Sequence, residues 1–212
     1  MDIQEVLTGE ETEILQELMN IAFGKSAADL AQVIDTYVVL SVPFIKVMQV
    51  TDLPEYVKGH VRDYNKISLV EQKFWGRFRG DAILIFSSGS GKELVKMLQH
   101  EDGAGCESDP IDILESETLM EVGNILIGAC VGRITELLKD VVTYTPPVVV
   151  VERNYYDAIA VNHFDPDKTA IVLKTDFTFK EGDVSGFLFL VTSNESIKWL
   201  KEALRLFLEQ YE

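Results

Sequence analysis

Two long stretches of the chain place apolar residues at the spacing of an amphipathic helix. They predict helices from about Glu11 to Ile34 and from about Ile111 to Leu138. Two shorter helices are predicted over 90–99 and 195–208. Runs rich in β-branched and aromatic residues predict strands at 37–42, 67–78, 82–86, 141–145, 148–152, 170–179 and 186–192. Helices segregated from mainly antiparallel strands indicate the α+β fold class.

This order of elements occurs twice along the chain. Three residues have counterparts 104 positions later: Glu17 and Glu121, Asn20 and Asn124, Pro43 and Pro147. The dipeptides Gly80-Asp81 and Gly182-Asp183 recur with an offset of 102. Each proline is expected at the start, edge or break of a strand, because proline cannot donate to a sheet ladder. Residues 1–212 are therefore predicted to form a single domain with pseudo-two-fold symmetry. Its halves, about 10–100 and 111–210 joined by a connector at 100–110, are expected to share one sheet with both long helices on one face.

Charge and composition exclude several classes of partner. The chain has 35 acidic and 19 basic residues, giving a net charge of −16. Nucleic acid and anionic membrane surfaces are poor partners for such a chain, because both attract a positive patch. We find no stretch approaching the roughly 20 apolar residues that span a membrane, and the N-terminus lacks the features of a secretory signal. We therefore expect a cytoplasmic protein.

Metal and phosphate-loop chemistry are not expected. Cys106 and Cys130 have no His or second Cys at metal-ligand spacing, and the three histidines are scattered. The segment GSGKE, residues 89–93, lacks the spacing and the Ser/Thr of a phosphate loop. We interpret it as the start of a helix.

The candidate chemistry lies on the two long helices. Glu13, Glu17 and Asn20 are spaced i, i+4, i+7, which places them on one stripe. Glu117, Glu121 and Asn124 repeat the stripe on the second helix. A single Glu-x-x-Asn occurs often by chance, and a polar stripe is usually a solvated face. Here the motif recurs at identical spacing and within the same order of helix and strand. This duplication favours a functional site.

These residue types suit the hydrolysis of an aspartyl phosphate. Water must attack the phosphorus in line, so catalysis depends mainly on positioning and electrostatics. A side-chain amide can orient water because it both donates and accepts hydrogen bonds. A nearby carboxylate can pair with a lysine of the partner and fix the docking register.

The repeated pattern resembles the CheC/CheX/FliY family of chemotaxis phosphatases. The family signature is Asp or Ser, three residues, Glu, two residues, Asn, about twenty-two residues, then Pro; both halves match it from Glu17 and Glu121 onward. The resemblance implies an α+β hydrolase acting on a phosphorylated CheY-type response regulator in two-component signalling. Asn20 and Asn124 would orient the attacking water, while Glu17 and Glu121 would contact the regulator's lysine. It also implies that magnesium belongs to the regulator, that this chain binds no cofactor or metal, and that a CheD-like deamidase is a possible partner.

The sequence departs from the family pattern at a few positions. Glu13 and Glu117 replace the leading Asp or Ser and are expected to contact the partner. The second half has the usual glycine before its asparagine, Gly123, which we expect to let the partner's backbone approach closely. Met19 stands there in the first half and would crowd that approach. We therefore expect the second site to be the stronger.

Three hypotheses remain open at this point. The first is a monomeric, two-site phosphatase for a response regulator. The second is a non-catalytic adaptor that binds a regulator or a CheD-like protein. The third is a structural paralogue without a regulator partner. Replacing Asn20 and Asn124 discriminates the first two, because only catalysis needs the amides.

Overall fold

The two long helices define one layer of the fold. The structure is a computed structural model, and it describes residues 7–33, 37–61, 66–98, 111–153, 169–180, 184–192 and 194–208. Helix α1 spans Gly9–Val33 and helix α4 spans Ile111–Leu137, which confirms both predicted long helices to within a few residues. A capping box starts α1: the Thr8 N–H donates to Glu11 Oε2, and the Glu11 N–H donates to Thr8 Oγ1. Helix α4 ends as Lys139 adopts a φ of 54°.

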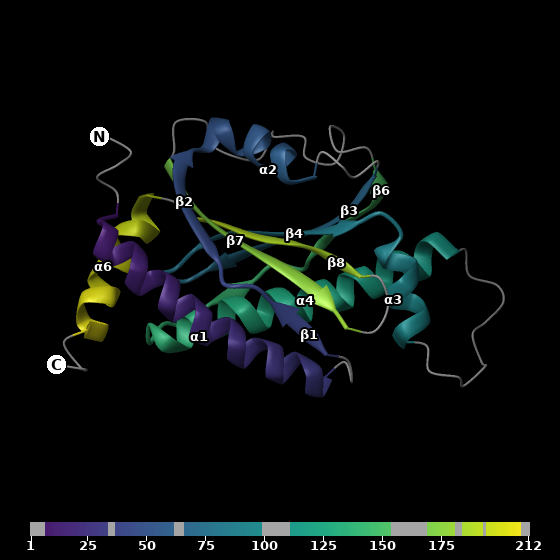
Figure 1. Ribbon diagram of the computed structural model, residues 1–212, viewed down its shortest axis with the longest axis horizontal. Helices are drawn as coiled ribbons and strands as arrows, with labels where there is room; N and C mark the ends of the chain where they lie inside the picture. The colour runs from purple at the N-terminus through teal and green to yellow at the C-terminus, as the bar shows by residue number, and fades with distance from the viewer. Residues whose placement is uncertain are drawn as a thin grey trace.

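The second layer is an antiparallel sheet. In the described part of the chain, eight strands form it in the order β1-β7-β8-β4-β3-β5, with β2 also pairing with β7 and β6 with β3. Their bounds are β1 Val38–Leu40, β2 Phe44–Gln49, β3 Ile67–Trp75, β4 Gly80–Ser87, β5 Thr143–Tyr144, β6 Val148–Arg153, β7 Thr169–Phe179 and β8 Ser185–Thr192. The predicted strands are confirmed, and β2 is an additional one. Figure 1 shows α1 and α4 together on one face of this curled sheet.

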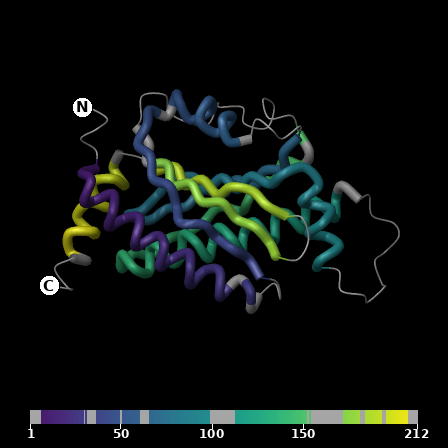
Figure 2. Tube along the Cα trace, in the orientation of Figure 1, coloured from purple at the N-terminus to yellow at the C-terminus, as the bar shows by residue number. Residues whose placement is uncertain are grey.

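The opposite face is covered by an element that the sequence pattern did not predict. A 3-10 turn, Val50–Asp52, leads into helix α2, Leu53–Val61, which lies across the sheet from α1 and α4 (Figures 1 and 2). Leu53 and Val57 of α2 are buried against sheet residues such as Leu69 and Phe189. The sheet is therefore buried on both faces, with the larger apolar cluster on the side of the long helices.

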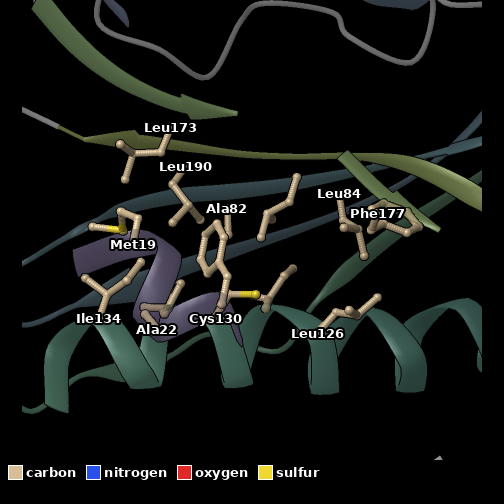
Figure 3. Close-up of a cluster of buried hydrophobic side chains, with 14 of the residues drawn as sticks. Met19, Ala22, Ala82, Leu84, Leu126, Cys130, Ile134, Leu173, Phe177 and Leu190 are labelled. Carbon is tan, nitrogen blue, oxygen red and sulfur yellow. The ribbon is translucent and has the colours of Figure 1, made fainter. Parts of the chain in front are cut away.

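The larger cluster joins both long helices to the central strands. Met19 and Ala22 of α1, with Leu126, Cys130 and Ile134 of α4, point toward the sheet in Figure 3. The sheet residues that meet them are Ala82, Leu84, Leu173, Phe177 and Leu190. All of these side chains are buried.

The two halves exchange elements. Helix α3, Ser90–Leu98, contacts α4 of the second half, and helix α6, Asn194–Leu208, contacts α1 of the first. Strands β1 and β2 pair with β7, whereas β5 and β6 pair with β3. Each half thus supplies edge strands and a short helix to the other. The helix start predicted at 90 is confirmed, whereas the connector at 100–110 and the Gly182-Asp183 repeat lie outside the described residues.

A pseudo-two-fold axis follows from contacts between equivalent residues. Asp29 Oδ2 accepts from Arg133 Nε at 3.0 Å across a sequence separation of 104, the offset of the repeat. Ser26 Oγ donates to the Ala129 carbonyl at 2.9 Å and also lies against Cys130, its own counterpart. In the sheet, Leu84 of β4 is paired with Leu188 of β8. The axis therefore passes through the α1–α4 crossing and the β4–β8 pair, confirming the predicted symmetry.

Helix α4 corrects one expectation about membranes. Its segment Ile113–Leu137 is long and apolar enough to cross a bilayer by length and composition, although no such stretch was expected. Half of its most apolar window is buried inside the protein. Leu119, Val122 and Ile127 belong to the cluster under the sheet. Packing against both α1 and the sheet explains why this helix is so apolar.

Candidate functional site

The two polar stripes face away from the sheet. Glu13, Glu17 and Asn20 of α1 are exposed, whereas Leu15 and Met19 between them are buried. The same holds on α4, where the exposed residues are Glu117, Glu121 and Asn124. The two helices run in roughly opposite directions (Figure 1). Because the motif is repeated on both helices, each carries one stripe. All six predicted polar residues are therefore accessible to a partner.

The Asn124 side chain is held by a buried glutamine of strand β3. Gln72 Nε2 donates to Asn124 Oδ1 at 2.8 Å and to the Thr145 carbonyl oxygen at 2.9 Å. The Gln72 side chain is almost fully buried, with 2% exposed. Its own Oε1 is buried and makes no hydrogen bond with any described residue. Asn124 is thus exposed at the surface, while its Oδ1 accepts a hydrogen bond from a buried side chain.

Thr145 is itself anchored to the sheet. Its N–H donates to the Lys73 carbonyl at 3.0 Å, and its Oγ1 accepts from the Lys73 N–H at 3.1 Å. Because Lys73 follows Gln72 in β3, the strand fixes both the glutamine and the carbonyl that it binds. The Asn124 amide is therefore connected to rigid backbone through one side chain.

The first half repeats this backbone arrangement with a different side chain. The Ser41 N–H donates to the Asp176 carbonyl, and the Asp176 N–H donates to Ser41 Oγ, both at 2.9 Å. Thr175 then occupies the place of Gln72, and its Oγ1 donates to the Ser41 carbonyl at 2.7 Å. No described residue is recorded in a hydrogen bond with the Asn20 side chain. The two asparagines therefore have different surroundings although their motifs are alike.

The role expected for Gly123 is wrong. Gly123 is buried rather than facing a partner. A Cβ built on it would lie 2.7 Å from Cγ1 and 2.9 Å from Cγ2 of Val70 in β3. The missing side chain thus lets α4 rest closely on the sheet of its own protein. Met19 likewise points into the core, with 1% of its surface exposed, and it does not crowd a partner.

The prolines lie where strand breaks were predicted. Pro43 separates β1 from β2, and its carbonyl accepts from Gln16 Nε2 of α1 at 3.1 Å. Pro147 directly precedes β6. The residues that follow, Phe44 and Val148, are counterparts in the repeat and are 56% and 62% exposed. Strands β2 and β6 each contact the long helix of their own half. Phe44 and Val148 nevertheless face the α2 side of the sheet, because residues an even number of positions along each strand, Met48 and Val150, pack in the cluster on that side.

The chemistry available at these stripes is that of amides and carboxylates. Within the described residues, no cluster of three or more His, Cys, Asp or Glu side chains could hold a metal ion. Each stripe offers carboxylates that can accept from a cation and an amide that can both donate and accept. This arrangement can orient a water molecule and dock a basic side chain.

A curated relative supports a chemotaxis assignment. No protein-family model matches the chain. The chain is 27% identical to the CheY-P phosphatase CheC of Bacillus subtilis over 139 residues, which is 66% of this chain and 65% of that relative. The match therefore spans slightly less than two thirds of the relative's length.

Several solved structures share the fold. FliY of Thermotoga maritima superposes with a TM-score of 0.71 at 19% identity, covering 95% of this chain and 98% of FliY. The FliM middle domain from Vibrio alginolyticus gives 0.58 at 16% identity, covering 89% and 99%. CheX of Borrelia burgdorferi, in a complex with CheY, BeF3 and Mg, gives 0.50 at 16% identity, covering 81% and 96%. The sequence match to CheC and the fold shared with FliY and CheX together support assignment of this chain to the CheC/CheX/FliY family.

Proposed function

We propose that this chain is a phosphatase that accelerates hydrolysis of the aspartyl phosphate of a CheY-type response regulator. The observation that carries the proposal is the exposure of both Glu-x-x-Asn pairs on the outer faces of α1 and α4. The relationship to CheC, a CheY-P phosphatase, supports the choice of substrate. Two sites related by the pseudo-two-fold axis would each engage one regulator.

The asparagines would supply the positioning that the reaction needs. Asn20 or Asn124 would enter the regulator's active site and hold a water molecule in line with the phosphorus–oxygen bond to the aspartate. The amide oxygen can accept from that water while the amide nitrogen donates to a phosphoryl oxygen. Neither step requires the amide to change its protonation state. The gain in rate comes from fixing the geometry of attack.

The carboxylates would set the docking register. Glu17 and Glu121 lie one helical turn before the asparagines, so each can pair with a lysine beside the phosphorylated aspartate. Glu13 and Glu117 extend the acidic stripe by one more turn. Magnesium would be held by the regulator, and the protein would act as a cytoplasmic monomer.

The test is the decay of a phosphorylated CheY-type receiver domain with magnesium present. Wild-type protein is compared with Asn20→Ala, Asn124→Ala and the double variant. Lys25→Ala and Glu136→Ala serve as matched controls, because both residues are exposed on the same helices away from the stripes. We expect wild type and controls to accelerate decay and the double variant to leave the spontaneous rate. Unchanged decay with wild type, across the receiver domains of the same cell, would refute the enzyme.

A non-catalytic adaptor is the alternative. The FliM middle domain shares the fold at a TM-score of 0.58, and a shared fold does not by itself determine activity. An adaptor would bind a regulator or a CheD-like protein through the same exposed stripes. In that case the double asparagine variant would still bind and regulate its partner. Measuring binding and phosphate decay on the same variants separates the two functions.

A further inference from the structure

The geometry points to Gln72 as a positioning residue for Asn124, one that makes the second site the principal phosphatase site. This inference rests on the proposed function and adds a residue from strand β3, outside the Glu-x-x-Asn motif. Gln72 acts through Asn124 and does not itself reach the surface, since only 2% of it is exposed. Its function would be to hold the reactive amide in one orientation.

The hydrogen bonds determine which way both amides point. The Thr145 carbonyl can only accept, so the group of Gln72 that faces it must be the NH2. The same NH2 faces Asn124, which must therefore present its oxygen inward. Asn124 is left with both N–H groups of Nδ2 and one lone pair of Oδ1 directed to solvent. These are the groups needed to donate to a phosphoryl oxygen and accept from the attacking water.

Gln72 occupies a position that otherwise favours an apolar residue. Val70 and Phe74, its neighbours at i−2 and i+2 in β3, belong to the apolar cluster under the long helices. The buried Gln72 Oε1 has no recorded hydrogen-bond partner in the described structure. A buried polar atom without a hydrogen bond destabilises the folded protein, because the bonds it makes to water in the unfolded chain are not replaced. A glutamine that is unfavourable for packing, yet bonded to the candidate catalytic amide, is consistent with a role at the site.

The first site lacks an equivalent of the Gln72–Asn124 hydrogen bond, although the backbone hydrogen bonds around it are the same. Thr175 lies between Leu173 and Phe177 in β7, as Gln72 lies between Val70 and Phe74. Its shorter side chain makes the bond to the Ser41 carbonyl, with none recorded to Asn20. Met19 stands at the position of α1 that is equivalent to Gly123, and its buried side chain occupies the place where α4 has none. Asn20 therefore stays free to rotate.

The kinetic test uses protein in which only the second site can work. In the Asn20→Ala background, Gln72→Met removes the donor but keeps an unbranched side chain of similar length. We expect kcat for receiver-domain dephosphorylation to fall about three- to tenfold, the population effect of one ordinary hydrogen bond, with KM unchanged. Thr175→Val in the same background is the matched control and should leave kcat unchanged. Adding Gln72→Met to Asn124→Ala should cause no further loss, because the two residues act as a unit.

Three results would overturn the inference while leaving the phosphatase intact. They are an unchanged kcat in Gln72→Met, a loss equal to that of Thr175→Val, and a loss that persists in the Asn124→Ala background. A wild-type protein that fails to accelerate decay would instead refute the proposed function. Asn20→Ala retaining most wild-type activity supports the ranking of the sites, and loss of most activity contradicts it.

A second measurement does not depend on activity. In ¹⁵N-labelled protein, the side-chain NH2 signals of Asn20 and Asn124 are identified by their loss in the two alanine variants. We expect the Asn124 amide to be the more rigid of the two in fast-motion relaxation. It should become as mobile as Asn20 in Gln72→Met. Equal mobility of the two amides in wild type would refute the positioning role.

Discussion

Gly123 allows the closeness of α4 and the sheet to be tested by one added methyl group. The substitution Gly123→Ala places a Cβ 2.7 Å from Cγ1, 2.9 Å from Cγ2 and 3.0 Å from Cβ of Val70. Val70 is fully buried in β3, which pairs with strands on both sides, so it cannot move away freely. Either α4 must lift from the strand or Val70 must leave its preferred rotamer.

The net effect is the difference between two opposing contributions. Alanine in a helix interior is favoured over glycine by about 1 kcal/mol. Forcing a methyl group into a packed core costs about 1–3 kcal/mol, and three close contacts with a β-branched side chain place this case at the upper end. We therefore expect Gly123→Ala to lower the free energy of unfolding by about 1–2 kcal/mol. For a chain of this size the corresponding fall in Tm is about 2–8 °C.

Urea unfolding with matched glycine variants measures this effect. Gly128 lies in the same helix and Gly24 in α1, and an added Cβ at either would meet nothing within 4 Å. Gly128→Ala and Gly24→Ala should therefore stabilise the protein by about 0.5–1 kcal/mol through helix propensity alone. Val70→Ala removes the two methyl groups that clash, so the double variant with Gly123→Ala should lose less stability than the two single variants together.

A stabilising Gly123→Ala, equal to Gly128→Ala, would refute the close packing of α4 on Val70. Additive losses in the double variant would do the same. Because a lifted α4 also moves Asn124 away from Gln72, the destabilised variant should lose the proposed phosphatase activity at temperatures where it remains folded. The glycine would then support the site from inside the protein.

Two further predictions concern the N-terminal cap of α1 and the buried Cys130 at the contact between α1 and α4. Thr8→Ala removes one half of the capping box and should lower the free energy of unfolding by about 1 kcal/mol in urea melts. Burial raises the pKa of the Cys130 thiol from its ordinary 9.0 to about 12, so in a Cys106→Ser protein this thiol should resist alkylation at pH 8 until the chain unfolds. Because the unfolded thiol ionises first, the contribution of Cys130 to stability should be constant well below pH 9.0 and fall as pH rises toward about 12. Cys130→Ala should show a smaller fall, and an identical pH profile would contradict the shift.

The long helices and the duplication were predictable because they leave strong periodic signals. Apolar residues at helical spacing mark α1 and α4, and three residues recur at one offset of 104. Strands β7 and β8 stand out as runs of β-branched and aromatic residues. Helix α2 is only nine residues long, and such a helix is stable mainly through packing on the sheet, which no local pattern reports.

The position of Gly123 was readable from the sequence but was interpreted wrongly. Gly123 lies four residues from both Leu119 and Ile127, which are buried on the inner face of α4. Helical periodicity therefore places it toward the sheet. The partner-facing role expected for Gly123 is wrong because a one-residue step from the exposed Asn124 turns the side chain by about 100° around the helix.

The unusual position of Gln72 is visible in the sequence, but the residue that it contacts could not be predicted from the sequence alone. A polar residue alternating with Val70 and Phe74 in a strand is unusual for a buried face and indicates a specific partner. The partner, Asn124, is 52 residues away in sequence and in the other half of the repeat. Gln72 and Asn124 come into contact only because the strands pair and α4 packs against β3 in the folded protein.

The exchange of elements between the halves explains how identical motifs can have unlike surroundings. The second site takes Asn124 and Thr145 from the second half but Gln72 from the first. At the first site these origins are reversed, because Thr175 belongs to the second half. A change in a strand of one half therefore alters the site carried by the helix of the other. The Glu-x-x-Asn motif is intact in both halves, while the glutamine that binds its amide is present at only one site, so an intact motif does not by itself make the surroundings of the two asparagines equivalent.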